Sequence, residues 1–374
     1  MSLRRIAVTG ADGFVGRNLA VRLGELGDDV LLLTRASTPE DWHRAVAQAD
    51  AVVHLAGANR PADPAEFMAV NAGTAELLAA AVAAAGRTIP VVYASSAKAG
   101  EDTDYGRSKR AGEARLLALA EETASTVTIF RLPNVFGKWA RPDYNSAVAT
   151  FCHNIPRDLP IRIDDPAAPL SLVYVDDVVQ AFLDVLDGRA GSGAKSGFVD
   201  VSTIYHTTVG AVADTIRGFR ADRDDNLIDE VGTGLTRALY ATYVAALPPS
   251  EFAYPIASHR DQRGAFSEML KTRTSGQFSY FTAHPGVTRG GHYHHTKTEK
   301  FLIVHGTALF RFRHIVTNET HEIRTSGTEP VIVETVPGWS HDVTNIGEDV
   351  MISLLWANEV FDRNRPDTIA AKVA

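Results

Sequence analysis

The amino-acid sequence predicts an α/β domain with a doubly wound parallel sheet, followed by an all-β domain of the jelly-roll type. Residues 6–132 alternate short apolar runs with helix-compatible stretches, which is the rhythm of βαβ units. Residues 278–356 instead contain short strand-like runs, each bounded by turn residues. Two prolines in LPPSE, at 247–251, end the helical pattern between these regions. We therefore expect one domain over residues 1–246 and a second over residues 247–374.

Size, charge and cysteine content narrow the class of protein. The chain has 374 residues, too many for one ordinary core, and a formal net charge of -8, which provides no basic face for nucleic acid or an anionic membrane. It contains no run of 18 apolar residues, and a strand pattern begins close to Met1. The single cysteine, Cys152, excludes an intrachain disulfide. We expect a cytoplasmic protein that binds neither nucleic acid nor a membrane.

A glycine-rich turn follows the first expected strand. The strands of the parallel sheet are expected at residues 6–10, 29–34, 51–57, 91–96 and 127–132. After the first of them, Gly10, Gly13 and Gly16 form a GxxGxxG pattern that lets backbone N–H groups approach a pyrophosphate at a helix N-terminus. The second run ends in Arg35 and carries no acidic residue for a ribose 2′-hydroxyl. An arginine there favours a 2′-phosphate, so we predict NADP(H) rather than NAD(H).

Two further short patterns suggest catalysis. Tyr105 and Lys109 in DYGRSK are four residues apart, so a helix places both on one face. We expect Lys109 to lower the pKa of the Tyr105 phenol, which would then act as a general acid near neutral pH. Ser95 and Ser96, at the end of the run VVYASS, offer a hydroxyl that can bind a substrate carbonyl oxygen.

Together with DAVVHLAG at 50–57, RLPNVFG at 131–137 and LVYVDDVV at 172–179, these patterns resemble the extended short-chain dehydrogenase/reductase family over residues 3–245. The resemblance implies a Rossmann-type domain in which Ser96 (or Ser95), Tyr105 and Lys109 are catalytic. It implies cofactor contacts from Gly10, Asp12, Gly13, Phe14, Val15, Gly16, Arg35, Leu55, Ala56, Gly57, Asn71, Tyr105, Lys109 and Pro133. The segment between Ser96 and Tyr105 is shorter than in most related epimerases and dehydratases, so the pocket lid must differ.

The same resemblance suggests where a substrate binds. Asn134, next to Pro133, would contact the substrate. Members that handle nucleotide sugars bind them with a helical part of the same domain, here residues 142–166. Arg157 and Arg162 in that segment would meet a diphosphate, although a solvated basic face is an equally good interpretation.

The strongest signal in the second domain is GVTRGGHYHHTKTEKFLIVHG, at 286–306. His292 and His294 are two residues apart, so both rings face one side of a strand, and Glu299 follows the turn. His341, in PGWSHDVTN, supplies a fourth ligand from a later segment. Three histidines and one carboxylate suit zinc, iron, nickel or manganese about equally. The pattern resembles the cupin superfamily, and surface histidines at a polar barrel mouth are the alternative.

A second likeness gives one histidine a different role. HRDQRGAFSEML, at 259–270, and TRGGHYH, at 288–294, resemble the deoxysugar 3,5-epimerases, whose histidine in this segment is a base. That role would make His292 a base rather than a ligand. The full ligand set favours the metal. The base is then His295, Tyr293, Lys300 or a bound water.

From end to end the chain resembles bifunctional capsular-polysaccharide enzymes of the CapF type. The segments that carry this resemblance are GGHYHHTKTEKFLIV, YGRSK and RLPNVFGKW. That family implies C3 epimerisation of a UDP-4-keto-6-deoxy-2-acetamido-L-hexose by a zinc-binding cupin. NADPH-dependent reduction at C4 then gives UDP-2-acetamido-2,6-dideoxy-L-talose. It also implies a homodimer or a higher homo-oligomer. The alternatives are a 4-keto reductase with a purely structural cupin and a non-catalytic sugar-nucleotide-binding scaffold, for which a tuned phenol has no use.

Overall fold

The structure is a computed structural model that describes residues 3–189, 196–224, 226–228, 230–256, 259–261, 264–266, 270–272, 276–359 and 364–373. It divides into two compact units. The first unit comprises Met1–Phe136, Asp143–Ser146 and Pro169–Thr207, and the second comprises Gly137–Pro142, Ala147–Ala168 and Thr208–Ala374. The boundary predicted at residues 246 and 247 lies inside the second unit, because the helical segments before it group with the barrel. As a boundary between sequence domains it stays a prediction.

The first unit contains the predicted parallel sheet, in the order β2-β1-β3-β4-β5-β8. Its strands are β1 (Arg5–Thr9), β2 (Asp29–Leu33), β3 (Ala51–His54), β4 (Val91–Ser96), β5 (Val127–Leu132) and β8 (Gly197–Phe198). β1 pairs in parallel with β2 on one side and β3 on the other. The chain therefore changes direction across the sheet beside β1, and ligands of such sheets bind at the carboxyl ends of the strands at that point. The doubly wound α/β fold is confirmed.

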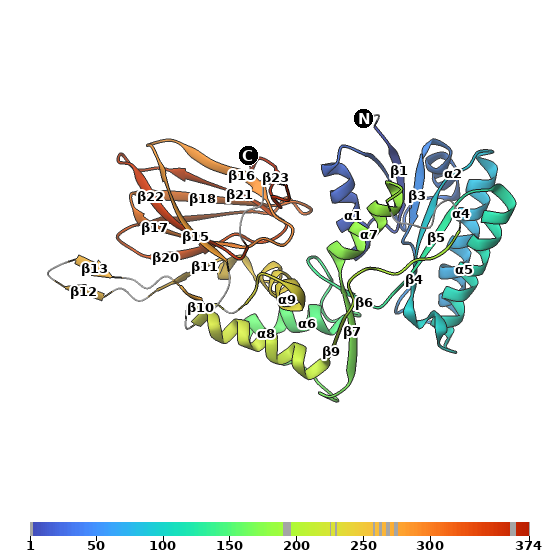
Figure 1. Cartoon of the computed structure of the whole chain (residues 1–374), viewed down its shortest axis with the longest axis horizontal. Coiled ribbons are helices and arrows are strands. Elements are labelled where there is room, and N and C mark those ends of the chain that lie inside the picture. The colour runs from blue at the N-terminus through green and yellow to red at the C-terminus, as the bar shows by residue number, and fades with distance from the viewer. Residues whose placement is uncertain are drawn as a thin grey trace. The chain divides into compact units, whose positions relative to one another are not determined.

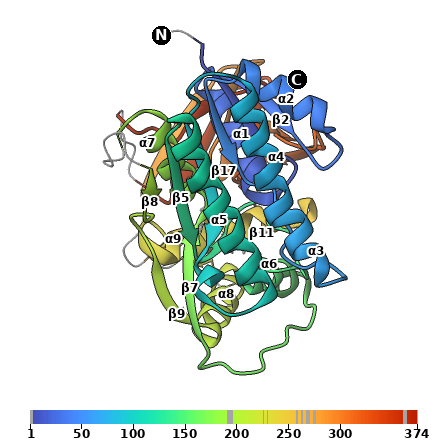
Figure 2. The ribbon, with the colours of Figure 1, turned by 90° about the vertical axis from the view of Figure 1, so that its right-hand side faces the viewer.

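Helices cover both faces of this sheet (Figures 1 and 2). The helical segments of the first unit are α1 (Phe14–Glu25), α2 (Pro39–Gln48), α3 (Ala65–Phe67), η1 (Met68–Ala72), α4 (Gly73–Ala84), η2 (Ala97–Gly100), α5 (Asp104–Thr123) and α7 (Val175–Leu186). A smaller three-stranded sheet consists of β6 (Asn134–Phe136), β7 (Pro169–Tyr174) and β9 (Tyr205–Thr208).

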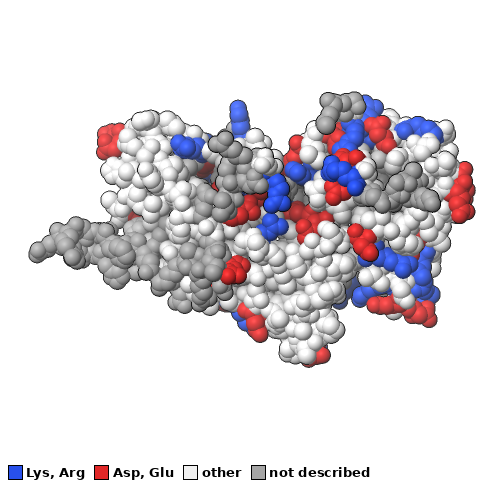
Figure 3. All heavy atoms as spheres, viewed as in Figure 1, with Lys and Arg blue, Asp and Glu red and all other residues white. Residues whose placement is uncertain are grey.

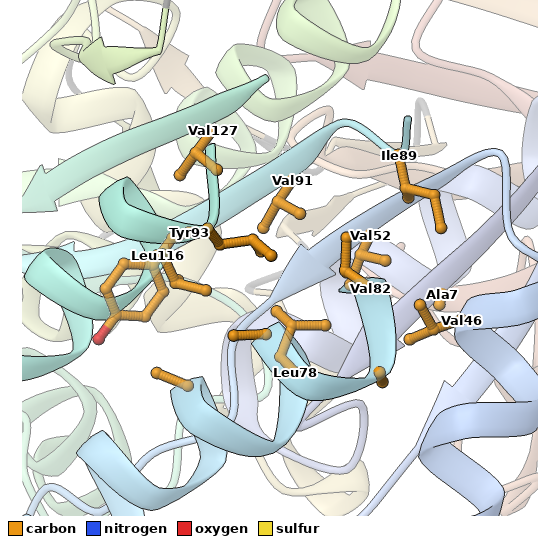
Figure 4. Packing of buried hydrophobic residues seen from close by; sticks show 14 of the residues in the cluster. Ala7, Val46, Val52, Leu78, Val82, Ile89, Val91, Tyr93, Leu116 and Val127 are labelled. Atoms are coloured by element: carbon orange, nitrogen blue, oxygen red, sulfur yellow. The ribbon is translucent and has the colours of Figure 1, made fainter. Parts of the chain in front are cut away.

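Two apolar clusters explain how the layers hold together. Val52 and Val91 pack with residues of α2, α4 and α5 on one face, as Figure 4 shows. Their chain neighbours Val53 and Val92 pack with residues of α1 and α7 on the other face. Because side chains alternate along a strand, an unbroken apolar run buries both faces at once. Four of the runs recognised in the sequence, those of β1, β3, β4 and β5, are buried in this way, whereas β2 is only partly buried.

One stretch, Ala65–Ala84, is long and apolar enough to cross a membrane by length and composition. In the structure it forms α3, η1 and α4, and α4 buries Leu78 and Val82 in the core of the first unit. A core helix of a globular domain passes the same test. On the face shown in Figure 3, positive and negative side chains of the described residues alternate without a broad basic area.

The second unit contains the predicted all-β barrel together with helices that were expected in the first domain. Its helical segments are α6 (Ala147–Asn154), η3 (Ile155–Arg157), α8 (Val209–Asp224), α9 (Gly234–Ala245) and η4 (Pro249–Glu251). The barrel consists of two five-stranded antiparallel sheets, in the orders β11-β20-β17-β22-β15 and β19-β18-β21-β16-β23. The strands are β11 (Ala253–Pro255), β15 (Gln277–Ala283), β16 (Thr288–Tyr293), β17 (Glu299–His305), β18 (Thr307–His314), β19 (Thr320–Ser326), β20 (Val331–Glu334), β21 (Trp339–Asn345), β22 (Met351–Ala357) and β23 (Ile369–Ala370). The remaining short strands are β10 (Leu227–Ile228), β12 (His259–Asp261), β13 (Gly264–Phe266) and β14 (Lys271–Thr272).

Buried charges join the helices of the second unit to the barrel. Arg223 of α8 pairs with Glu334 of β20, which also pairs with Lys300 of β17. Lys300 donates a further hydrogen bond to the Tyr254 hydroxyl at 3.1 Å. Removing one member of such a buried set leaves an uncompensated charge, which costs several kcal/mol. The helices and the barrel therefore depend on each other.

Trp139 makes a second connection inside this unit. Its backbone has a φ of 68°, which is rare for a bulky residue. Its ring lies against Gly338, where a Cβ atom would stand 2.7 Å from the ring. The Gly338 amide donates a hydrogen bond to the carbonyl of His294 at 2.9 Å. Only glycine fits at this contact, beside a predicted metal ligand.

Candidate active sites

The predicted reductase residues gather where β4 ends and α5 begins. Ser96 is the last residue of β4, and α5 starts at Asp104, where the Thr103 hydroxyl caps it by accepting the Gly106 amide at 3.0 Å. Tyr105 and Lys109 thus lie one turn apart on α5. Lys109 is buried and donates from Nζ to the Ala94 carbonyl of β4 at 2.9 Å. Strand pairing and helix capping together bring the three side chains to one place.

The pKa of Tyr105 in this site differs from the expectation. Burial lowers the pKa of Lys109 to about 8. Burial also raises the pKa of Tyr105, and a hydrogen bond with the Ser96 side chain offsets only part of that effect. The expected lowering of the phenol pKa by Lys109 is therefore not found, and loss of water sets the direction of the shift. The Tyr105 hydroxyl instead donates to Asn59 Oδ1 at 3.2 Å, so the phenol is held in its protonated form.

The structure distinguishes the two serines. Ser95 is buried and donates to Glu113 Oε1 at 2.5 Å. Arg131 binds the same carboxylate with two nitrogens, at 3.0 and 2.7 Å. Ser95 therefore holds α5 against the sheet, whereas Ser96 faces Tyr105. Glu113 was missed in the sequence, although its position four residues after Lys109 places it on the same helix face.

The connection between these elements is short and tightly held. After Ser96 the chain makes the 3-10 turn η2, whose first turn is capped by the Ser96 hydroxyl accepting the Lys98 amide at 3.2 Å. Arg110 of α5 donates to the carbonyls of Ala99 and Glu101, the latter at 2.8 Å. The abbreviated lid predicted between Ser96 and Tyr105 is thus a compact turn fixed to α5.

The glycine loop has the close contacts that a dinucleotide site needs. Gly10 has a φ of 64°, and a Cβ atom there would lie 2.8 Å from the Ala56 nitrogen. A Cβ atom on Gly16 would lie 2.2 Å from the Gly10 carbonyl oxygen. The loop includes Asp12 and leads into α1, whose first two residues are Phe14 and Val15. The first turn of α1 contains no acidic residue. Free N–H groups at such a helix start suit a pyrophosphate.

The end of β3 lies beside this loop. The Thr9 hydroxyl accepts the amides of Leu55 and Ala56 at 3.0 and 3.1 Å. Gly57 lies against Asn71, whose Oδ1 accepts the Ala58 amide at 2.8 Å. The Asn71 amide group donates to the Ser108 hydroxyl at 2.9 Å and to the Ala58 carbonyl at 3.2 Å. Asn71 therefore shapes the loop after β3, and its direct contact with a cofactor stays a prediction.

The remaining residues predicted to contact the cofactor or the substrate lie in several different segments. Arg35 follows β2 and is exposed, as a residue that meets a 2′-phosphate must be. Pro133 lies between β5 and β6, and Asn134 of β6 donates to the Ser171 carbonyl at 3.2 Å. Arg157 donates to the carbonyls of His153 and Ala246, and Arg162 pairs on the surface with Asp164 at 2.7 Å. Both arginines already have protein partners, so their role toward a diphosphate stays a prediction.

A buried histidine behind the reductase site was also missed. His54 of β3 bonds to the Thr9 hydroxyl through Nδ1 at 2.7 Å and stacks on Tyr93 at 5.3 Å between ring centroids. Burial lowers its pKa to about 3, with the Lys109 charge contributing. Tyr93 in turn lies under the Lys109 ammonium, 4.8 Å from the ring centroid. A histidine in an apolar strand run gives no sequence signal for this neighbourhood.

The four predicted metal ligands come together inside the barrel. His292 is on β16, His294 follows that strand, Glu299 begins β17, and His341 is on β21 directly opposite His292. One nitrogen or oxygen from each residue lies within 4.8 Å of the others. His294 Nε2 and His341 Nε2 stand 3.2 and 3.6 Å from Glu299 Oε2. Ligands of a tetrahedral zinc at about 2.0–2.1 Å are roughly 3.3 Å apart, so the set fits such an ion.

The protonation of the cluster also suits a cation. Burial, with the neighbouring His341 and His294, lowers the pKa of His292 to about 4, and burial lowers the pKa of His341. Burial alone would raise the pKa of Glu299, but His294 and His341 hold it well below its usual value. Metal ligands must be neutral imidazoles and ionised carboxylates, and these are the favoured forms here.

The three side chains considered as an epimerase base lie elsewhere. Lys300 follows Glu299 on β17 and is bound to Glu334 and Tyr254, because successive side chains of a strand point to opposite faces. Tyr293 and His295 alternate with the two predicted ligand histidines, and their rings meet edge to face with centroids 5.6 Å apart. Arg263 and Glu268 of the epimerase-like segment lie outside the described residues. The choice of base among Lys300, Tyr293, His295 and a bound water stays a prediction.

Two family descriptions match the chain. Residues 6–196 match the NAD dependent epimerase/dehydratase family, and residues 259–369 match the polysaccharide biosynthesis C-terminal domain. The first match covers the glycine loop and the reductase residues. The second covers the four-residue cluster.

Known proteins match this chain over all or part of its length. The chain is 52% identical over 370 residues, 99% of both chains, to a Pseudomonas aeruginosa protein named UDP-2-acetamido-2,6-beta-L-arabino-hexul-4-ose reductase. It is 29% identical over 254 residues to a dTDP-4-dehydrorhamnose reductase of Mycolicibacterium smegmatis, covering 59% of this chain and 74% of that one. The crystal structure of the capsular polysaccharide assembling protein CapF from Staphylococcus aureus matches with a TM-score of 0.68 and 37% identity. That match covers 98% of this chain and 100% of CapF.

The two family matches follow one another along the chain, and the relatives named above match across both of them. The chain therefore belongs to the NAD dependent epimerase/dehydratase family and, within it, to the CapF-type reductases that carry a C-terminal cupin.

Proposed function

We propose that this protein is a bifunctional nucleotide-sugar enzyme of surface polysaccharide synthesis. Its barrel epimerises C3 of a UDP-4-keto-6-deoxy-2-acetamido-L-hexose, and its first domain then reduces the C4 ketone with NADPH. The product is UDP-2-acetamido-2,6-dideoxy-L-talose. The observation that carries the proposal is the full-length identity of 52% to a UDP-sugar reductase, in a chain that retains both sites.

The reductase residues account for the second step. Bound NADPH supplies the hydride that attacks C4. The Ser96 hydroxyl donates a hydrogen bond to the C4 carbonyl oxygen, and the protonated Tyr105 hydroxyl transfers its proton to that oxygen. The cationic form of Lys109 stabilises the phenolate that remains on Tyr105. The C=O bond thus gains one hydride and one proton and becomes an alcohol.

The barrel residues account for the first step. The proton on C3 is acidic because it is next to the C4 ketone, and its loss leaves an enolate. His292, His294, Glu299 and His341 would hold zinc, which supplies positive charge to the enolate oxygen. Return of a proton to the opposite face of C3 completes the epimerisation. Because this step needs the ketone, it precedes the reduction.

One experiment tests both activities. The protein is incubated with the enzymatically prepared 4-keto sugar and NADPH in deuterated water, and NMR follows the products. Oxidation of NADPH with deuterium at C3 supports both steps and the substrate class. Oxidation without deuterium at C3 supports a reductase with a structural cupin, and no oxidation rejects the sugar.

The second candidate function is a reductase with a purely structural cupin. The matches to proteins named only as reductases favour it. Metal content separates the two roles only in part, so the C3 label decides. We also propose a cytoplasmic homodimer or higher homo-oligomer, in keeping with a free, buried Cys152 and the family resemblance. Light scattering on the purified protein measures the mass in solution.

A further inference from the structure

The last described residues of the chain, 364–373, bond to the segments that carry the predicted metal ligands. We call them the C-terminal strap. Within it, β23 pairs with β16 at His292 and Tyr293. The Ala371 amide donates to the Gly291 carbonyl at 2.8 Å, and the Ser340 hydroxyl donates to the Ala371 carbonyl. The strap therefore bonds to both strands that carry the facing ligands His292 and His341.

Asp367 of the strap organises the loop between the other two ligands. Its carboxylate accepts three consecutive backbone N–H groups, from His295 at 2.9 Å and from Thr296 and Lys297 at 2.8 Å each. The Thr296 hydroxyl adds a fourth bond at 3.1 Å. These amides lie between His294 and Glu299, so one carboxylate fixes the path of the chain from one ligand to the next. Charged acceptors make such bonds stronger than neutral ones.

The same residue orients a ligand directly. The Asp367 carbonyl oxygen lies 2.6 Å from His294 Nδ1. A carbonyl oxygen can only accept, so Nδ1 carries the proton and Nε2 keeps its lone pair. That nitrogen is the one that faces Glu299 at 3.2 Å. Outer partners of this kind fix the tautomer and ring direction of metal-binding histidines.

Further bonds hold the strap in place. Lys297 donates to the Thr368 hydroxyl at 2.9 Å and to the Pro366 carbonyl at 3.2 Å. Arg313 of β18 donates to the Lys372 carbonyl at 2.6 and 3.2 Å. Asp367 itself has a φ of 33°, a backbone conformation that aspartate adopts more readily than most residues. The strap is thus anchored on both sides of Asp367.

We propose that the C-terminal strap sets the metal affinity of the cluster, with Asp367 as the positioning residue. This inference rests on the proposed metal site. Every ligand-bearing segment either bonds to the strap or begins where the Asp367-bound loop ends. The site is consequently complete only when the end of the chain is in place.

The test compares Asp367→Asn with the wild-type protein. Both are stripped with a chelator, and Zn²⁺ affinity is measured by competition with a chromogenic chelator. Asparagine keeps the size of the side chain but replaces one acceptor oxygen with an NH₂ group that faces amide donors. We expect affinity to fall about 10- to 100-fold, as for outer partners of other metal sites. In the Co²⁺-loaded proteins, the d–d absorption bands should also change, which a loss of general stability would not cause.

Asp224→Asn is the matched control. Asp224 lies in the same unit, on α8, with 66% of its side chain exposed in a surface pair with Arg220. The substitution removes the same charge and should leave affinity and spectrum unchanged. If wild-type protein binds no Zn²⁺, the proposed metal site fails. If it binds and Asp367→Asn binds within twofold, the positioning role fails.

Arg313→Ala provides an independent test of the strap if the Asp367→Asn protein does not fold. This change removes two bonds at the far end of the strap, from a partly exposed side chain, without touching the loop. We expect a smaller loss, about two- to fivefold, because the strap frays from its end. An unchanged affinity in the folded Arg313→Ala protein would contradict the inference.

Discussion

The two sites of this protein are built in different ways. The reductase residues Ser96, Tyr105 and Lys109 come from one strand end and the first turns of the next helix. The metal cluster draws on β16, β17 and β21, and its support reaches to Asp367. The first site is therefore set by one strand end and the helix that follows it along the chain. The second depends on strand pairing between distant parts of the chain.

Burial also has opposite consequences in the two sites. At the reductase site it lowers the pKa of Lys109 to about 8 and so opposes the charge that the proposed reduction uses. In the barrel it lowers the pKa values of His292 and His341 and so favours the neutral rings that bind a cation. The same loss of water works against one site and for the other. Four predictions test this contrast, from the largest effect to the smallest.

Exchanging one essential group in each site should separate the two activities. Tyr105→Phe removes the proton donor, so C4 reduction should fall about 10³- to 10⁴-fold while deuterium still enters C3. Glu299→Gln should lower Zn²⁺ binding and C3 labelling, and NADPH oxidation should fall with them because the reduction follows the epimerisation. NADPH oxidation and NMR on the same samples measure both. Loss of C3 labelling in Tyr105→Phe as well would show that the sites are not independent.

The two adjacent serines should behave differently. Ser96→Ala removes a donor to the carbonyl oxygen, and kcat should fall roughly 10²-fold with little change in stability. Ser95→Ala leaves the buried Glu113 with one donor fewer, so the free energy of unfolding should fall by about 1–3 kcal/mol. Kinetics and urea denaturation of both variants provide the comparison. Equal kinetic losses would contradict the assignment of Ser96.

Arg35→Ala tests the choice of cofactor. If the guanidinium binds a 2′-phosphate, kcat/KM with NADPH should fall about tenfold or more, while the value with NADH should stay nearly constant. Arg60→Ala, also an exposed arginine of the first unit, serves as the control. A parallel fall with both cofactors would indicate that Arg35 acts on the fold of the loop instead.

The reductase step should lose activity in mildly alkaline solution. A lysine is charged below its pKa, and the pKa of Lys109 is lowered to about 8, so the cation disappears as the pH rises through that value. Reduction should then decline about tenfold per pH unit above 8. Single-turnover rates between pH 6 and 10 test this. A flat profile up to pH 10 would mean that the charge of Lys109 is not used.

The sequence predicted most of what lies along one element or one motif. The buried strands, the glycine loop, the Tyr105 and Lys109 face of α5, and the four predicted metal ligands follow from spacing. The structure brings the members of each of these sets together. Residues whose role depends on distant partners were not found. Asp367 lies 26 residues beyond His341 in an unremarkable segment, and Arg223 and Glu334 meet across 111 positions. The Tyr105 pKa was misjudged because burial is a property of packing rather than of spacing.

The contact between Trp139 and Gly338 bears on how the protein is made. About 200 residues separate the two positions. At roughly 5–20 residues per second, a ribosome needs about 10–40 s to supply the partner of the tryptophan. During that interval the first unit can complete its sheet, but the segment 137–142 has no barrel on which to rest. The nascent chain thus exposes an indole ring through most of its own synthesis, and chaperones that recognise aromatic segments would find it there.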